Sequence, residues 1–136
     1  MSHYISEIMR LFVGKRANFC CEYCLLPEYA SFYTFHIDHI ISIKHGGLTI
    51  KANLAYACPV CNINKGSDIA TVLDDIKDSI RFYNPRVDVW TEHFDVHASG
   101  LLIPKTNIGE ETIKILQLNQ TDSIIERSKM VRLGLI

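Results

Sequence analysis

Two CxxC units constrain this chain most: Cys21 with Cys24, and Cys58 with Cys61, separated by 33 residues. Each two-residue spacer presents a pair of sulfurs with the bite that tetrahedral zinc requires, and four thiolates fill the coordination shell. We therefore expect a closed, structural zinc site that holds this region folded. The alternative is four buried free cysteines, but in a reducing compartment paired CxxC units favour metal.

The fifth cysteine, Cys20, is adjacent to the first unit. A zinc site that used Cys20 together with Cys24 would have a three-residue spacer, which is a poorer geometry than the two-residue spacer. We therefore interpret Cys20 as a core residue.

Length and composition bound the architecture. The chain has 136 residues, 48% of them apolar, which suits one domain, or one domain with a docked extension. No apolar run approaches the roughly 18–20 residues that span a bilayer. The first 17 residues read as an amphipathic helix and not as a signal peptide. We expect a cytoplasmic protein that does not bind membranes.

The charge distribution argues against a protein that coats DNA. The net charge is −1, with six Lys/Arg and four Asp/Glu in residues 1–66 and the opposite imbalance in residues 67–136. Attraction to phosphates that does not depend on sequence should therefore be modest. An enzyme whose metal ion supplies local positive charge is still compatible with this balance.

The first half of the chain is predicted to form a helix, two strands and a second helix. Residues 6–17 have helical apolar spacing, and residues 33–42 are rich in aromatic and β-branched side chains typical of a strand. Gly46 and Gly47 mark a loop, residues 53–58 a short second strand, and Pro59 the first turn of a helix that ends near Gly66.

The second half is predicted to be an extension without chemistry. Ser67 is expected to cap a helix over residues 68–82. Residues 87–96 and 101–104 read as a hairpin. Two helices over residues 110–118 and 121–133 close the chain, with Gly134 as the stop. We interpret Trp90 as a core residue, and His93 and His97 as structural or surface residues. The expected domains are 1–66 and 67–136.

Chemistry-bearing residues lie between and just after the CxxC units. Asp38 supplies a hard oxygen for Mg²⁺ or Mn²⁺, and the neighbouring His39 can deprotonate a water. Asn62 follows the last cysteine and offers a carboxamide oxygen. Alternation along a strand places His36 and Asp38 on one face and His39 on the other, unless the strand ends or twists there. An Asp-His pair alone would usually be polar decoration of a strand edge.

The run HIDHIISIKHGG–x5–NLAYACPVCNINKG resembles the HNH endonuclease family, whose fold is ββα-metal. The resemblance covers residues 21–66 and implies an α+β fold: a ββα-metal core with a four-cysteine zinc site, flanked by an N-terminal helix and a C-terminal extension of a hairpin plus helices. Residues 67–136 are similar to extensions of some bacterial HNH proteins, which favours a bacterial or phage setting. Ser42 stands where the family often has proline.

Carried over to this chain, the resemblance implies Asp38 and Asn62 as ligands of the catalytic metal and His39 as the general base. Asn53 would hold the long loop by side-chain hydrogen bonds and so orient His39. His36 would be an auxiliary ligand or a phosphate contact. Lys65 is either a phosphate contact or a solvated charge, and His45 a solvated loop residue.

The expected function is metal-dependent hydrolysis of DNA that leaves 5′-phosphate and 3′-hydroxyl ends, with RNA as a further candidate substrate. One active site per chain suggests nicking unless the protein forms a homodimer. The alternative is a non-catalytic zinc-knuckle module that binds nucleic acid, which would need no Asp38, His39 and Asn62 together. A zinc deaminase would need an open zinc site and a nearby Glu, whereas four cysteines close this one.

Overall fold

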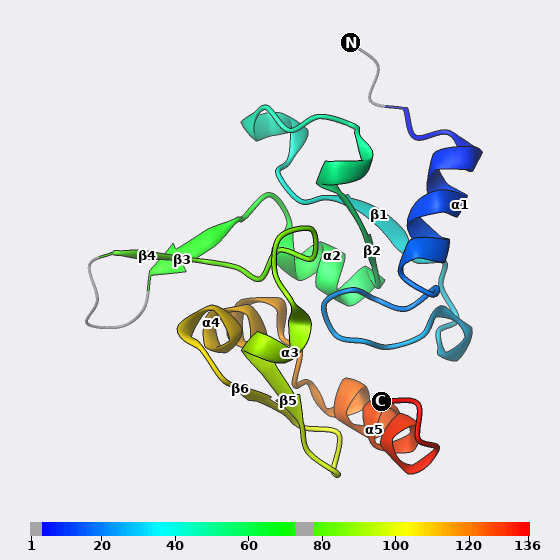
Figure 1. Cartoon of the computed structure of the whole chain (residues 1–136), viewed down its shortest axis with the longest axis vertical. Helices are drawn as coiled ribbons and strands as arrows, with labels where there is room; N and C mark the ends of the chain where they lie inside the picture. Colours follow the sequence, from blue (N-terminus) through cyan, green and yellow to red (C-terminus); the bar gives the residue numbers. More distant parts are fainter. Residues whose placement is uncertain (1–3, 73–77) are drawn as a thin grey trace. The chain divides into compact units, whose positions relative to one another are not determined.

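The computed structural model describes residues 4–72 and 78–136 and divides the chain into two compact units, residues 1–69 and 70–136 (Figure 1). Within the described residues, the first unit combines helices with one two-stranded antiparallel sheet and the second combines helices with two, so the expected α+β class is confirmed. In the described part of the chain, no helix has the length and apolar character needed to cross a bilayer. The first unit carries the predicted chemistry, and its elements decide where those side chains lie.

The first unit opens with α1 (Glu7–Arg16) and continues to the hairpin of β1 (His36–His39) and β2 (Leu54–Ala57), followed by α2 (Pro59–Lys65). Ser6 caps α1 by accepting a hydrogen bond from the Met9 amide at 3.1 Å. The two strands pair in antiparallel register, so that Asp38 faces Ala55 and His39 faces Leu54. Helix α1 packs on β2 and helix α2 on β1.

Strand β1 is shorter than the predicted strand over residues 33–42, because side chains take up the backbone hydrogen bonds on both sides of it. The Glu28 carboxylate accepts from the Phe35 amide at 2.7 Å. Beyond the strand, the amide and carbonyl of Ile41 bond the side chain of Asn53. The helix over residues 6–17, the strand over residues 53–58 and the helix from Pro59 are confirmed within one or two residues.

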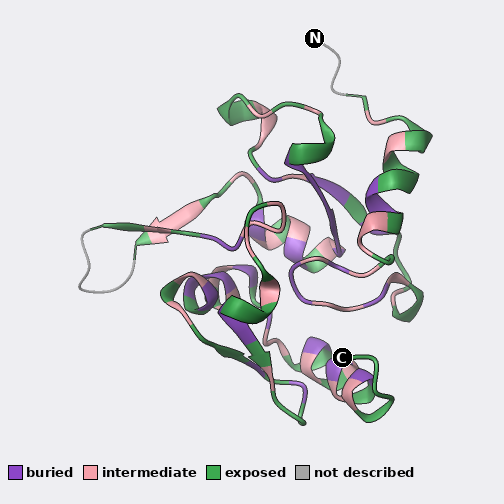
Figure 2. Cartoon of the chain, in the orientation of Figure 1, coloured by how far each residue is buried: buried purple, intermediate pink, exposed green. Residues whose placement is uncertain are grey.

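Buried apolar residues of α1, β1, β2 and the segments that flank β1 form the core of the first unit, and buried residues are coloured purple in Figure 2. Tyr56 contacts Phe35 with ring centroids 5.6 Å apart and Phe19 at 6.0 Å. Its hydroxyl donates to Glu28 at 2.7 Å. The buried members of this core are Val13, Tyr23, Phe35, Ile37, Ile40, Leu54, Ala55, Tyr56 and Ala57.

The second unit contains β3 (Ala70–Val72), β4 (Ser79–Arg81), α3 (Trp90–His93), β5 (Phe94–Val96), β6 (Leu102–Pro104), α4 (Asn107–Leu116) and α5 (Thr121–Arg132). Strands β3 and β4 pair with each other, as do β5 and β6. Both closing helices are confirmed, and Gly134 follows α5 with φ +71° as a stop residue should.

The predicted helix over residues 68–82 is wrong. Its described ends pair as β3 and β4, with Thr71 opposite Ile80. These β-branched residues have a stronger preference for strands than for helices. Residues 73–77 of the predicted helix lie outside the described part of the chain.

The predicted hairpin in the second unit is confirmed only at β5 and β6, because its first part is not a strand. The Asp88 carboxylate accepts from the Asn84 amide at 2.9 Å and pairs with both terminal nitrogens of Arg81 at 2.7 and 2.8 Å, which folds residues 84–88 into a turn. Helix α3 follows this turn. The buried His93 bonds Thr106, the cap of α4, so its structural interpretation agrees with the contacts.

The loop between β1 and β2 needs glycine at two positions for different reasons. Gly46 has φ +88° with open space around it. A Cβ on Gly47 would lie 1.7 Å from the carbonyl oxygen of Ile41 and 2.9 Å from the side-chain carboxamide nitrogen of Asn53. Gly47 therefore allows the close approach of the two ends of the loop.

We predict that Gly47→Ala destabilises the protein far more than Gly46→Ala. At Gly46 the cost is the left-handed backbone alone, about 1–2 kcal/mol. At Gly47 the backbone of Ile41 must move, which breaks the contacts of Asn53. Chemical denaturation of both zinc-loaded variants tests the order, and equal losses of stability would contradict it.

Candidate active site

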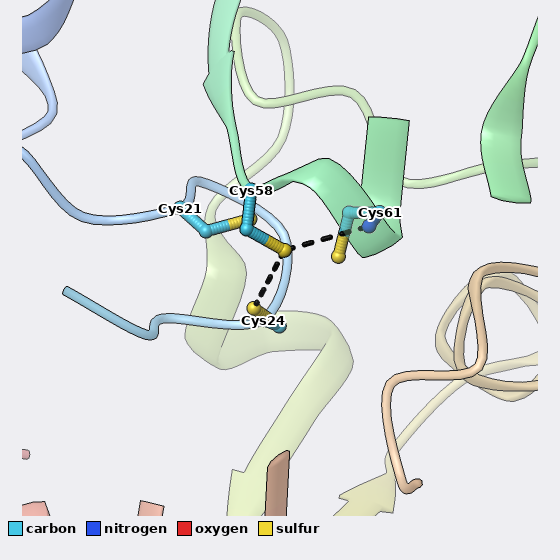
Figure 3. A group of neighbouring side chains, drawn as sticks. All are labelled: Cys21, Cys24, Cys58 and Cys61. Atoms are coloured by element: carbon cyan, nitrogen blue, oxygen red, sulfur yellow. Dashed lines mark hydrogen bonds between the residues drawn. The ribbon is translucent and has the colours of Figure 1, made fainter. Parts of the chain in front are cut away.

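Four buried sulfurs converge at the end of the hairpin, as Figure 3 shows. Cys21 and Cys24 come from the turn before β1, whereas Cys58 and Cys61 come from the start of α2. Their ligand atoms all lie within 4.8 Å of one another, and the sulfurs of Cys24 and Cys58 are 3.7 Å apart. Tetrahedral zinc with Zn–S bonds of about 2.3 Å spaces its sulfurs about 3.8 Å apart. The donor set therefore fits a structural zinc.

The thiols of the cluster affect one another strongly. The pKa of Cys58 is lowered because the neighbouring thiols of Cys21, Cys24 and Cys61 bond its sulfur. Burial raises the pKa of Cys21. A thiolate is the form that binds metal, and a buried cluster with one favoured thiolate is suited to a cation. Cys20 lies outside the cluster and is half-buried.

The first CxxC turn is joined to the hairpin through its two middle residues. Glu22 accepts from the Tyr56 amide at 2.8 Å, and its own amide donates to the Tyr56 carbonyl at 2.9 Å. The Tyr23 hydroxyl donates to Asp38 at 2.7 Å. Sequence reasoning missed the contact of Tyr23, although its place between two zinc ligands was a usable signal. The zinc turn thus supports Asp38 directly.

Asp38 is buried, 4% exposed, and lies beside the ammonium of Lys65, which is 2% exposed. The Lys65 nitrogen is 3.3 and 3.4 Å from the two carboxylate oxygens. Burial raises the pKa of Asp38, while Lys65 and the Tyr23 hydroxyl act in the opposite direction. Burial also raises the pKa of Tyr23. The phenol therefore stays protonated and can donate its hydrogen bond to Asp38.

The buried position of Lys65 argues against the phosphate contact and against the solvated charge considered from the sequence. Its shortest hydrogen bond, 3.0 Å, goes to the Ile40 carbonyl, and a longer one of 3.4 Å goes to the His39 carbonyl. Lys65 therefore ties α2 to the end of β1. Its contacts with Asp38 are longer than the roughly 2.7–2.9 Å of strong charge-assisted hydrogen bonds.

The donor chemistry at Asp38 is compatible with a divalent cation. A carboxylate has about four lone-pair sites, and the Tyr23 hydroxyl needs only one. Lys65 can retain its bond to Ile40 while Asp38 accepts a harder and more highly charged partner. Asn62, the second predicted ligand, is half-buried in the first turns of α2. An ammonium beside Asp38 should weaken the affinity of the empty site for a metal.

The side chain of Asn53 bonds the start and the middle of the loop that joins β1 to β2. Its carboxamide oxygen accepts from the Ile41 amide, and its nitrogen donates to the carbonyls of Ile41 and Leu48, each at 2.9 Å. These are side-chain bonds of the kind expected from the sequence. His39 lies half-buried at the end of β1, and its ring bonds Thr49 in the same loop.

Among the described residues of the first unit, two other histidines are exposed. His36 begins β1 and is solvent-accessible, and His45 lies at the exposed turn of the loop. The solvated interpretation of His45 agrees with this position. The structure brings Asp38, Tyr23 and Lys65 together, and holds His39 against the loop fixed by Asn53.

Residues 21–68 match the model of the HNH endonuclease family. This segment is an HNH domain. The match begins at the first zinc cysteine and ends just after α2, so it covers the zinc cluster, the hairpin and the helix. No curated protein and no solved structure matches the chain. The second unit, residues 70–136, lies entirely outside the matched segment.

We predict that the HNH domain carries about one zinc per chain and that Cys58→Ala loses it together with the fold. Cys20→Ala is the matched control and should keep the metal, because Cys20 lies outside the cluster. Elemental analysis and circular dichroism of protein purified without added metal test this. A folded, zinc-free wild type would contradict it.

We further predict that Lys65→Met destabilises the zinc-loaded protein by roughly 3–5 kcal/mol, because it leaves a buried carboxylate without its counter-charge. Added Mn²⁺ should recover part of that loss and should stabilise the variant more than the wild type. Denaturation with and without Mn²⁺ measures both effects, with the exposed Lys44→Met as control. A loss equal to that of the control would show that the Asp38–Lys65 contact is unimportant.

Proposed function

We propose that this protein is a metal-dependent endonuclease that hydrolyses phosphodiester bonds of DNA and leaves 5′-phosphate and 3′-hydroxyl ends. The observation that carries the proposal is the adjacency of Asp38 and His39 on β1, inside a segment that matches the HNH model. The hydrogen bonds of Asn53 that hold the loop beside His39 support it.

His39 is the proposed general base. Its neutral imidazole takes a proton from a water, the water oxygen forms a bond to phosphorus, and the bond from phosphorus to the 3′ oxygen breaks. The 3′ oxygen leaves and takes a proton from solvent, while the imidazolium returns its proton to solvent. Atoms and charge balance over the cycle, and no co-reactant other than water is needed.

Asp38 and Asn62 are the proposed ligands of the catalytic cation. When bound, Mg²⁺ or Mn²⁺ supplies Lewis-acid stabilisation of the charge that develops on the phosphate. Two protein ligands leave most of the shell to waters and substrate. Tyr23 and Lys65 hold the Asp38 carboxylate, and Asn53 acts through the loop and not on the substrate. His36, exposed at the start of β1, is retained as an auxiliary phosphate contact.

The substrate and setting follow from the same proposal. DNA is the proposed substrate and RNA the competing one, and single-strand nicking is expected from one site per chain unless two copies pair. A cytoplasmic location and a bacterial or phage origin remain predictions from the sequence. The competing function is a zinc module that binds nucleic acid without cleaving it. The weak net charge of −1 disfavours that alternative.

We predict that the zinc-loaded wild type cleaves supercoiled plasmid only when Mg²⁺ or Mn²⁺ is added after mild chelation. His39→Ala should cleave at least ~10²-fold more slowly, the usual cost of losing a positioned base. Asp38→Ala and Asn62→Ala should lose activity while they retain zinc. Asn53→Ala should show a milder defect. The exposed His45→Ala serves as the control.

Single-turnover cleavage with end-group analysis is the measurement. DNA binding without cleavage under every metal condition would favour the binding module. Products with 3′-phosphates, or a His39→Ala variant as fast as wild type, would overturn the assigned chemistry even in a working nuclease.

A further inference from the structure

The imidazole of His39 contacts a hydroxyl of the loop that follows it. Its Nε2 atom lies 2.9 Å from the Oγ1 atom of Thr49. Thr49 is half-buried and lies ten residues further along the chain, between the glycines and β2. The family pattern leaves this position inside an unspecified stretch of five residues, and the sequence gives no signal for it.

Thr49 is well placed to position the ring, because the backbone next to it is fixed. The carbonyl of Leu48, the preceding residue, accepts from the Asn53 carboxamide at 2.9 Å. The same carboxamide bonds the Ile41 backbone, two residues after His39. The chain segments on both sides of the His39–Thr49 contact are therefore joined through one side chain.

The direction of this hydrogen bond decides which ring nitrogen can accept a proton as the general base. A neutral imidazole has one N–H and one lone pair, and a threonine hydroxyl can donate or accept. If the hydroxyl donates to Nε2, it occupies the lone pair that a base requires. If it accepts from Nε2–H, the lone pair lies on Nδ1, on the other side of the ring.

We infer that Thr49 is a positioning residue: its hydroxyl accepts from Nε2–H of His39, which fixes the tautomer in which Nδ1 takes the proton from water. This inference rests on the proposed role of His39 as general base. It completes a chain of contacts from Asn53 through the loop backbone to Thr49 and the ring. In this inference Thr49 acts through the His39 ring, so its effect should fall on turnover and not on binding.

The first test compares Thr49→Val, Thr49→Ser and the matched control Thr34→Val, an exposed threonine of the same unit. One neutral hydrogen bond contributes about 0.5–1.5 kcal/mol, so Thr49→Val should lower kcat roughly 3- to 10-fold. The KM for DNA and the zinc content should not change. Thr49→Ser keeps the hydroxyl and should restore kcat.

Three outcomes of this comparison would overturn the inference: wild-type kcat in Thr49→Val, an effect confined to KM, or a Thr49→Ser variant as slow as Thr49→Val. If Thr49→Val loses zinc, the kcat of Thr49→Ser and the spectroscopic test below still decide whether Thr49 positions His39.

The second test does not depend on cleavage. Side-chain ¹⁵N NMR of zinc-loaded wild type, without divalent ion and at a pH about 1.5 units above the unperturbed histidine value of ~6.5, reports the tautomer of His39. We expect Nε2–H in the wild type and a mixture of tautomers in Thr49→Val. Nδ1–H in the wild type would overturn the inference even if the protein cleaves DNA. Nε2–H in a protein that cleaves nothing would support the Thr49 contact while the proposed function failed.

Discussion

The sulfur cluster joins parts of the first unit that the rest of its fold would join only weakly. Strands β1 and β2 pair over four residues each, and a hairpin of this length is marginal in water without further support. The cysteines connect the turn before β1 to the start of α2. Through Glu22 and Tyr23, the same turn reaches β2 and the carboxylate of Asp38. A metal held by sulfur thus determines where an oxygen ligand of the proposed second metal lies.

The local elements of the first unit could be predicted because each follows from short-range chemistry. Pro59 marks the first turn of α2, the apolar spacing of residues 6–17 predicts α1, and the spacing of the cysteines indicates their convergence. The ends of β1 could not be predicted. The side chains of Glu28 and Asn53 accept the backbone hydrogen bonds of Phe35 and Ile41, which a neighbouring strand would otherwise accept. The segment after Ser67 was misjudged because its apolar spacing suits a helix, whereas its β-branched residues pair in strands.

The candidate residues were predictable by type, but their environments were not. Asp38 and His39 stand out as a pair in the sequence, yet only the fold shows that a buried lysine lies beside the carboxylate. From the sequence Lys65 was either a phosphate contact or a solvated charge, since lysine is rarely buried without a partner and the sequence does not show one. Its partner lies 27 residues away. Thr49 carries no signal at all, because its role depends on a loop conformation set by Asn53 and Gly47.

The way in which Asn53 closes the loop also determines where this domain can diversify. The carboxamide joins Ile41 to Leu48, and Gly47 between them must stay without a side chain because it packs against the Ile41 backbone. Lys44, His45 and Gly46 are exposed in the same turn. Because Gly46 has φ +88°, new side chains are best accepted at Lys44 and His45, which the hydrogen bonds of Asn53 do not involve. Descendants of such a chain could acquire different target preferences at this turn without changing the chemistry.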